Sequence, residues 1–228
     1  MLIVLLVLLL VTPMALYVIV SLPSVQQHLC QVGETELTKL LGTNVEIESV
    51  SITPFNQLSV NNVTIEDDNR FDAVKIKTID AGIDLYEYLK NDKIVITHAA
   101  LIGLDAQLYK QDQSSPLNIQ NIINNLKPKD KTKPPTQYDL RINTIVIRNS
   151  QMAYDIKSIP VSDSGFDKNH IKISDLNADI YMPQLKNDDF IFKIKRFGVK
   201  EQSGLSISDI QGDFHIASSG IDVNGLEL

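Results

Sequence analysis

An interrupted β-strand pattern recurs through this chain and limits what it can fold into. In LSVNNVTI, residues 58–65, apolar and polar residues alternate up to Val60, and the alternation resumes at Val63 after two adjacent asparagines. Successive strand side chains point to opposite faces, so one extra residue would turn the second half of the segment away from the first. Five further segments repeat this form, namely VEIESVSI (45–52), VKIKTIDA (74–81), LRINTIVI (140–147), IKISDLNADI (171–180) and LSISDIQGDF (205–214). Such repetition indicates a stacked, quasi-one-dimensional architecture.

Two structures could explain the two extra polar residues in each repeat. They could form a two-residue hairpin turn, but such turns favour glycine, which none of these pairs contains, and arms of three residues are too short for a stable hairpin. A β-bulge instead sets two residues against one on the neighbouring strand, restores the face and bends the strand. We therefore favour the bulge, which predicts that Val60 and Val63 face the same interior of a curved sheet.

The apolar positions of three repeats are predicted to line the inner surface of this sheet. They are Val45, Ile47, Val50, Ile52, Leu58, Val60, Val63, Ile65, Leu140, Ile142, Ile145 and Ile147. The pattern alone also allows these faces to pack against each other as a closed β-sandwich core.

Composition narrows the classes of function. The net charge of −7 argues against a nucleic-acid partner, because nucleic-acid-binding proteins normally present a basic face. Cys30 is the only cysteine, so no intramolecular disulfide can form. The four histidines, at positions 28, 98, 170 and 215, show no metal-ligand spacing, and no phosphate-binding loop or nucleophile motif occurs. We therefore expect no enzyme activity, metal or cofactor.

The order of segments suggests how the chain is organised. Residues 1–23 are predicted to be an uncleaved transmembrane helix, and a cleaved signal peptide is disfavoured because no basic n-region and no cleavage site are visible. An amphipathic helix that caps the sheet or forms an entry platform is expected over 24–42, ending at Gly42. Strands and short helices follow over 43–126, with helical segments predicted at 84–91 and 115–126. The Pro- and Lys-rich segment 127–136 is a connector or a lipid-headgroup contact, and further strands of a longer array are expected over 137–228.

This order resembles the N-terminal region of the AsmA/TamB superfamily of Gram-negative envelope proteins. The resemblance runs through the hydrophobic first segment, LTKLLGTNVEIESVSITPFNQLSVNNVTIEDD, IDLYEYLKNDKIVITHAALIGLDAQLYK and the SPLNIQNIINNL segment. These motifs are degenerate, and their order carries the similarity. The family's long central array and C-terminal conserved domain do not appear in these 228 residues.

The resemblance implies a single inner-membrane span and a periplasmic, taco-shaped β-groove capped by short helices. The implied function is phospholipid transport between the inner and outer membranes in outer-membrane biogenesis, with acyl chains held in the groove. The alternative is a scaffold or chaperone for assembly and secretion of outer-membrane β-barrel proteins, which would pair with an open sheet edge.

Overall fold

The computed structural model describes residues 18, 21–52, 57–84, 90, 94–126, 138–162, 165–186, 189–217 and 220–227. Over these residues the chain forms one open, mixed, largely antiparallel sheet of ten strands together with two helices, which confirms the prediction of a mainly β protein. The elements are α2 (Pro23–Leu41), β1 (Val45–Ile52), β2 (Gln57–Glu66), β3 (Asp72–Ile83), β4 (Ile94–Lys110), α4 (Gln120–Leu126), β5 (Tyr138–Ile156), β6 (His170–Lys186), β7 (Asp189–Glu201), β8 (Ser206–Ile207), β9 (Gln211–Ala217) and β10 (Gly220–Glu227).

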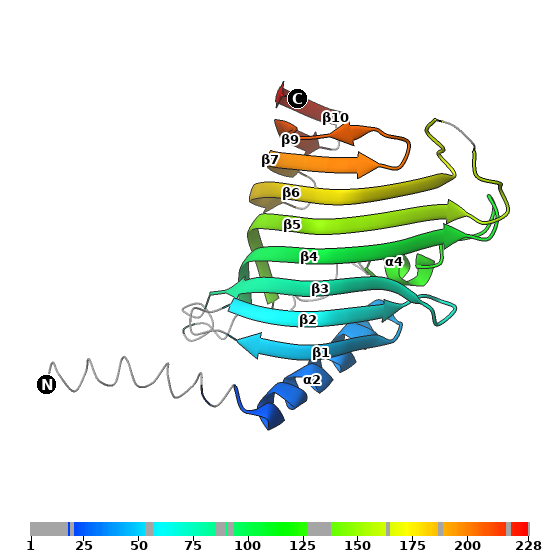
Figure 1. Cartoon of the computed structure of the whole chain (residues 1–228). Helices are drawn as coiled ribbons and strands as arrows, with labels where there is room; N and C mark the ends of the chain where they lie inside the picture. The colour runs from blue at the N-terminus through cyan, green and yellow to red at the C-terminus, as the bar shows by residue number, and fades with distance from the viewer. Residues whose placement is uncertain are drawn as a thin grey trace, which may run out of the picture.

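The strands lie in the sheet in nearly the order in which they occur in the sequence (Figure 1). Neighbouring strands pair antiparallel, except that β4 and β5 run parallel. Parallel neighbours need a crossover connection, and the segment that joins β4 to β5 contains α4. The short strand β8 pairs with β7 beside the main path, so the repeat at 205–214 is divided between β8 and β9.

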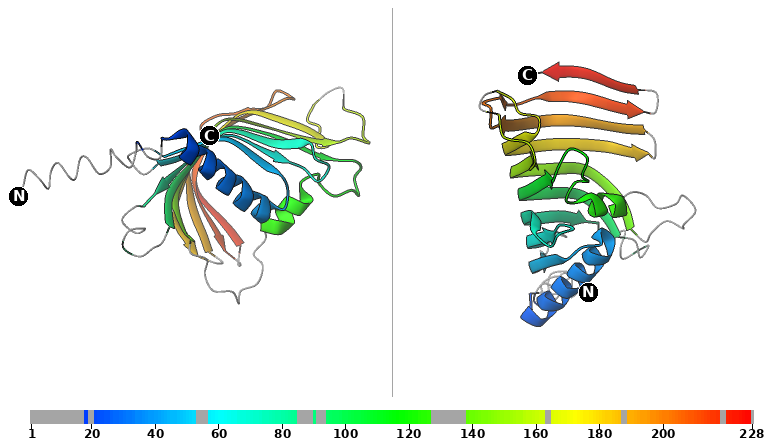
Figure 2. Two further views of the ribbon diagram at one scale, coloured as in Figure 1. Left: turned by 90° about the horizontal axis from the view of Figure 1, so that it is seen from below. Right: turned by 90° about the vertical axis from the view of Figure 1, so that its right-hand side faces the viewer.

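The sheet is strongly bent, and both helices lie on its concave side (Figure 2, left). We call this side the inner face and the opposite side the outer face. Seen along the other direction, α2 lies at the β1 end of the stack of strands (Figure 2, right). The helices therefore cover the inner face at one end of the sheet.

One residue in each of several adjacent strands is left out of the pairing at the same level of the sheet. Glu48 and Asn62 are skipped between β1 and β2, and Lys77 and Gly103 are skipped where β3 meets β2 and β4. The residues skipped from β4 and β5 include Gly103 and Asn149. Asn62, Gly103 and Asn149 have φ values of 49°, 66° and 49°, in the left-handed region that Asn and Gly adopt more readily than other residues. We call this row of skipped residues the fold line.

The fold line decides between the two explanations of the sequence pattern. LSVNNVTI lies within the single strand β2, so a hairpin turn is excluded there. Val63 is 1% exposed in the hydrophobic core, and Val60 packs against the same core. The prediction that both face one interior is confirmed. A two-against-one bulge is nevertheless wrong for β1–β4, because each strand carries its own extra residue and the extra residues oppose one another.

Bulges do occur in the second half of the sheet. Ser174 and Asp175 of β6 lie opposite the single residue Gln151 of β5, and Asp175 has a φ of 52°. The bulge explanation is therefore confirmed for the repeat at 171–180. In LRINTIVI the parallel register also shifts, between Ile96 and His98 of β4, whereas the positive-φ residue of β5 lies further on, at Asn149.

The core lies between the inner face of β1–β4 and the two helices. Apolar residues three apart in each strand belong to it, because the fold line returns the second residue of each pair to the inner face. The strand residues are Val45, Ile47, Val50, Leu58, Val60, Val63, Ile65, Val74, Ile76, Ile79, Leu101 and Leu104, and the helical side contributes Leu29, Cys30, Leu37, Leu41, Ile119 and Ile122.

Helix α2 matches the predicted capping helix in its bounds. It ends at Gly42, whose φ of 74° and N–H bond to the Thr38 carbonyl at 2.8 Å form a C-terminal cap. A Cβ at this glycine would lie 2.2 Å from the Asn125 side chain of α4, which donates to the Leu41 carbonyl. The sequence predicts one broad apolar face made of Val25, Leu29, Val32, Leu37, Leu40 and Leu41. This face is too broad, since Val32 and Leu40 are 46% and 53% exposed.

Helix α4 begins at Gln120, later than the predicted start near Ser115 and Pro116. The reason is that Asn118 is held against β4 in a non-helical position. Its backbone N–H donates to the Tyr109 carbonyl at 2.9 Å, and its side-chain oxygen accepts the Tyr109 N–H at 3.0 Å.

Three predictions fall largely or wholly on residues outside the described ranges. They are the anchor over 1–23, the helical turn over 84–91 and the linker over 127–136. Within the described ranges, no helix combines the length and the apolar character that a membrane crossing requires.

Candidate binding surface

Three apolar rows cross the inner face from β1 into the second half of the sheet. Residues directly opposite each other on paired strands point to the same face, so the rows can be followed through the register. They are Val50–Val60–Ile79–Leu101–Ile147–Ala178–Phe197, Ile52–Leu58–Ala81–Ala99–Ile145–Ile180–Ile194–Gly212 and Val45–Ile65–Val74–Ala106–Met152–Ile173. The third row stops at β6, because the residue opposite Ile173 on β7 is the acidic Glu201. A shorter row, Phe192–Phe214–Val223, continues the inner face to β10.

The exposure of these rows changes along the sheet. Under α2 and α4 the side chains of Val45, Ile47, Val50 and Val63 are 1–6% exposed. From β5 onward the apolar inner-face residues are mostly half-buried, and Val223 on β10 is 44% exposed. In the described part of the chain, the helices lie close to β1 and to each other, and the side-chain cluster beneath them extends only to β4. The inner face of β5–β10 is therefore the accessible apolar surface.

The twelve predicted lining residues fall into three groups. Val45, Ile47, Val50 and Val63 are buried beneath the helices, so their neighbours are protein side chains. The half-buried group comprises Ile52, Leu58, Val60, Ile65, Ile145 and Ile147. Leu140 and Ile142 belong to β5, and their side chains lie outside the described ones. The apolar residues of β6–β10 extend the inner face beyond the predicted set.

Two phenylalanines stack on this surface. The rings of Phe192 and Phe214 stack with centroids 5.1 Å apart and an interplanar angle of 2°. Both belong to the row that ends at Val223. They give β7 and β9 a flat apolar area on the inner face, which the low aromatic content of the sequence did not suggest.

The outer face of the same strands is charged. Asp179 of β6 accepts from Arg148 of β5 and lies 3.5 Å from Arg196 Nε of β7, while Lys193 and Asp213 pair at 3.3 Å. These residues occupy positions between the inner-face rows. The second half of the sheet thus has one apolar and one ionic face.

Polar side chains satisfy backbone groups that the fold line leaves without strand partners. The Ser150 hydroxyl, 1% exposed, accepts the Leu104 N–H at 3.2 Å, and the Asn177 side-chain oxygen accepts the Asn149 N–H at 3.1 Å. A buried backbone group without a partner is costly. These side chains therefore stabilise the bend that carries the apolar rows.

A buried carboxylate fastens the connection that leads to α4. Asp67, 2% exposed, accepts hydrogen bonds from the N–H groups of Asn69 and Phe71, from the Tyr109 hydroxyl and from the Asn118 amide. Burial raises the pKa of Asp67, but these hydrogen bonds together hold it below its ordinary value. The arrangement joins the β2–β3 turn, the end of β4 and the segment before α4.

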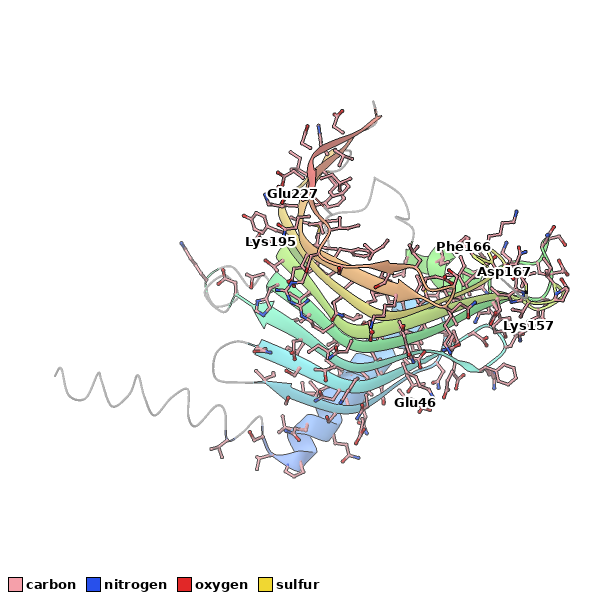
Figure 3. All side chains as sticks on the ribbon, turned by 45° about the horizontal axis from the view of Figure 1, so that its top comes forward. Glu46, Lys157, Phe166, Asp167, Lys195 and Glu227 are labelled. Carbon is pink, nitrogen blue, oxygen red and sulfur yellow. The ribbon has the colours of Figure 1, made fainter. Side chains whose placement is uncertain are left out.

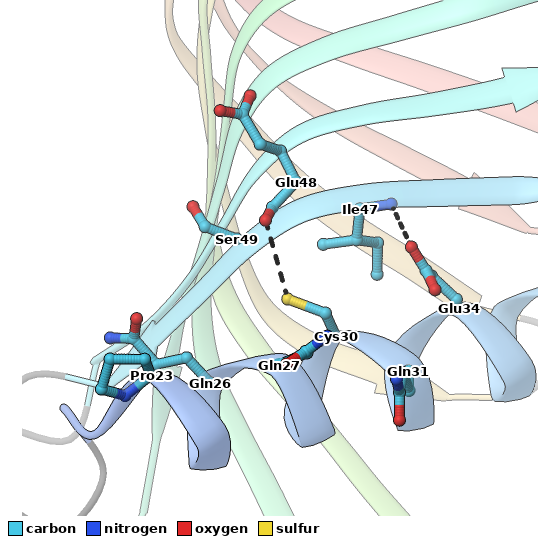
Figure 4. A pocket seen from close by; sticks show the side chains of 9 residues that line it. All are labelled: Pro23, Gln26, Gln27, Cys30, Gln31, Glu34, Ile47, Glu48 and Ser49. Carbon is cyan, nitrogen blue, oxygen red and sulfur yellow. Dashed lines mark hydrogen bonds between the residues drawn. The ribbon is translucent and has the colours of Figure 1, made fainter.

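Helix α2 also occupies the free edge of β1 (Figure 4). The Glu34 carboxylate accepts the Ile47 N–H at 2.9 Å, and the Cys30 thiol donates to the Glu48 carbonyl at 3.9 Å. A cavity of about 380 Å³ beside these contacts is lined by Pro23, Gln26, Gln27, Cys30, Gln31, Glu34, Ile47, Glu48 and Ser49. Its lining is mainly polar, unlike the inner face.

Among the described residues, no group of three His, Cys, Asp or Glu side chains could hold a metal ion. A comparison with protein-family models finds no match. A search of curated proteins likewise finds no relative.

Proposed function

We propose that the inner face of β5–β10 holds the hydrocarbon chains of phospholipids, and that this chain belongs to a lipid-carrying β-groove protein similar to the AsmA/TamB superfamily. The observation that carries the proposal is that the apolar rows continue past the helices and are only half-buried there. An acyl chain can contact any aliphatic side chain, so Ile, Val, Met and Phe in varied order suffice. Each CH₂ group removed from water contributes about 0.8 kcal/mol.

The proposed setting is the inner membrane, with residues 1–23 as a single-pass anchor and the sheet in the periplasm. In this arrangement the bent sheet is one part of a groove, with α2 and α4 closing it at the β1 end. The charged outer face would remain in water while lipid tails contact the inner face. Binding and passage of lipid would require no bond to be made or broken, so the proposed protein is not an enzyme.

Site-specific photocrosslinking in the full chain tests this proposal. A benzophenone amino acid at Ile194, an inner-face position of β7, should crosslink to phospholipid in cells and in vesicles. The matched control is Ile191 on the same strand, which is 42% exposed and lies on the outer face opposite His215. Lipid adducts at 194 but not at 191 would support the proposal. Equal labelling at both positions, or at neither, would overturn it.

One further observation favours a second candidate function. Within the described residues, β10 pairs with β9 and has no strand on its other side. An open edge of this kind can accept an incoming strand by backbone hydrogen bonding, as a scaffold for outer-membrane β-barrel precursors would require. Crosslinks from residue 224 on β10 to a barrel precursor, without lipid adducts at 194, would favour the scaffold.

A further inference from the structure

His170 is a buried titratable residue outside the proposed lipid-binding surface. It begins β6, pairs with Asp155 of β5 and is 6% exposed. Its ring Nδ1 lies 3.0 Å from Asp155 Oδ1, and its Nε2 lies 3.0 Å from the Ile159 carbonyl oxygen. An ionised carboxylate and a carbonyl can only accept hydrogen bonds, whereas a neutral imidazole has a single N–H. Both contacts can be hydrogen bonds only if both ring nitrogens carry a proton.

The ring connects two strands and the loop between them. Ile159 lies early in loop 157–169, and the His170 N–H donates to the Asp167 carbonyl at 3.1 Å. The Asp167 carboxylate in turn accepts the N–H groups of Ser162 and Asn169 at 2.9 Å each. The start of the loop is held separately, because the N–H groups of Lys157 and Ser158 donate to the Lys110 and Gln111 carbonyls at 3.0 Å each. The imidazole and Asp167 connect the residues that follow, Ile159 and Ser162.

The loop presents apolar side chains to solvent. Val161 and Phe166 are 64% and 60% exposed, and Figure 3 shows Lys157, Phe166 and Asp167 together at one end of the sheet. From the neighbouring turn after β7, the Gln202 amide donates to the His170 carbonyl at 2.6 Å. His170 thus contacts the loop through its ring and the turn after β7 through its backbone carbonyl.

We propose that His170 is a pH-sensitive clasp. As an imidazolium it holds the loop around Ile159 to Asp155 of β5, and on deprotonation it releases the loop at Ile159. Two carboxylates act on the ring, Asp155 from β5 and Asp167 from the loop. On the turn after β7, Gln202 is neutral, and the Glu201 carboxylate accepts hydrogen bonds from Ser203. The clasp therefore consists of the His170 imidazolium and its two hydrogen-bond acceptors, the Asp155 carboxylate and the Ile159 carbonyl.

The direction of the pH dependence follows from these contacts. The hydrogen bond to Asp155 raises the pKa of His170, burial lowers it, and the Ile159 carbonyl and Asp167 raise it, with a net increase over the ordinary value. A raised pKa in the folded state means that the clasp stabilises fully below the unfolded pKa of about 6.5. This stabilisation is lost as the pH rises through the folded pKa.

Two measurements on the full chain in micelles test the clasp. NMR titration of the His170 ring should give a pKa above that of an unfolded reference peptide. Hydrogen exchange of the Ser162 and Ile159 amides, corrected for intrinsic rates, should become at least about tenfold faster once the ring is neutral, as expected when a charge-assisted hydrogen bond is lost. A His170 pKa at or below the reference value would overturn the proposal.

Asp155→Asn provides a variant that keeps the shape of the side chain and removes the charge. It should lower the pKa of His170 and move the loop transition to lower pH by the same amount. His215→Gln is the matched control, because His215 lies 3.7 Å from Asp222 and its side chain is 40% exposed. It should leave both measurements unchanged. Exchange at Ile159 and Ser162 that is independent of pH, or insensitive to Asp155→Asn, would overturn the clasp.

Discussion

The two halves of this sheet use the same strand pattern with different results. In β1–β4 the extra residues oppose one another along the fold line, and two helices bury the inner face. The pairing of β1–β4 shifts near strand ends, after Ile65 and after Gly82. In β5–β10 it also shifts within strands, between Ser174 and Asn177 of β6 for example, and the apolar rows stay partly exposed. Close packing against helices penalises small displacements. The covered half therefore keeps its register across the fold line, whereas β5–β7, against which neither helix packs over the residues that the structure describes, carry shifts beside it.

A charge placed in each half should have the largest contrasting effects. Val63→Asp would put a carboxylate at a position that is 1% exposed, and it should lower the free energy of unfolding by about 4 kcal/mol or more, because a buried charge without a partner is costly. Val223→Asp, at a position that is 44% exposed, should change it by less than about 0.5 kcal/mol. Urea unfolding of the full chain in micelles, followed by circular dichroism, measures both. Equal effects would show that the two halves do not differ in packing.

The second largest loss of stability is expected when the attachment of α4 over the inner face is weakened. Asp67→Asn removes the charged acceptor that fastens the segment before α4, and we expect a loss of about 2–4 kcal/mol, since several buried donors lose a charged partner. Because the pKa of Asp67 is lowered by folding, its stabilisation is present above the unfolded pKa of about 3.9 and is lost as the pH falls through the folded pKa. The difference between wild type and variant should therefore shrink on acidification. A constant difference down to strongly acidic pH would contradict this role.

The fold line itself can be tested at Gly103. Its φ is +66°, and a Cβ there would lie 2.9 Å from the Lys77 Cβ, so Gly103→Ala should cost about 2 kcal/mol. Gly204 also has a positive φ, of +98°, but a Cβ added there would have no neighbour within 4 Å, so Gly204→Ala should cost only about 1 kcal/mol. Thermal melts of the two variants provide the comparison. If Gly204→Ala were the more damaging, the close approach of strands at the fold line would not matter for stability.

The smallest effect is expected at the edge of β1. Glu34→Ala removes the acceptor of the Ile47 N–H and should cost about 1 kcal/mol. Glu36→Ala on the same helix removes only the exposed ion pair with Lys39 and should cost less than about 0.5 kcal/mol. Denaturant midpoints measured in parallel should resolve the difference. Indistinguishable midpoints would mean that water replaces Glu34 at this edge.

The sequence was sufficient for features that depend on nearby residues. The strands, the end of α2 at Gly42 and the common face of Val60 and Val63 follow from alternation and glycine position. The fold line in β5 was not predicted, because Ser150 occupies the position where the pattern requires an apolar residue. The sequence feature that marks the fold line in β5 is Asn149. The fold line has an Asn or a Gly at its other positive-φ positions as well, Asn62 and Gly103.

The parallel pairing of β4 and β5 could not be predicted from local patterns. It depends on the route of the crossover, and this route is fixed by contacts between residues far apart in sequence, such as Asp67 with Tyr109 and Asn118. The covered part of the inner face depends on the same contacts. The predicted lining of twelve aliphatic residues therefore included side chains of different kinds. Four of them are buried beneath the helices, and six are half-buried.

The two edges of the sheet differ, because α2 makes contacts along β1. On that side, side chains of the helix already use backbone groups that a further strand would need. Within the described residues the other side, β10, keeps its backbone groups available. Within the described residues, a further strand would therefore meet helix α2 at β1 and an open edge at β10.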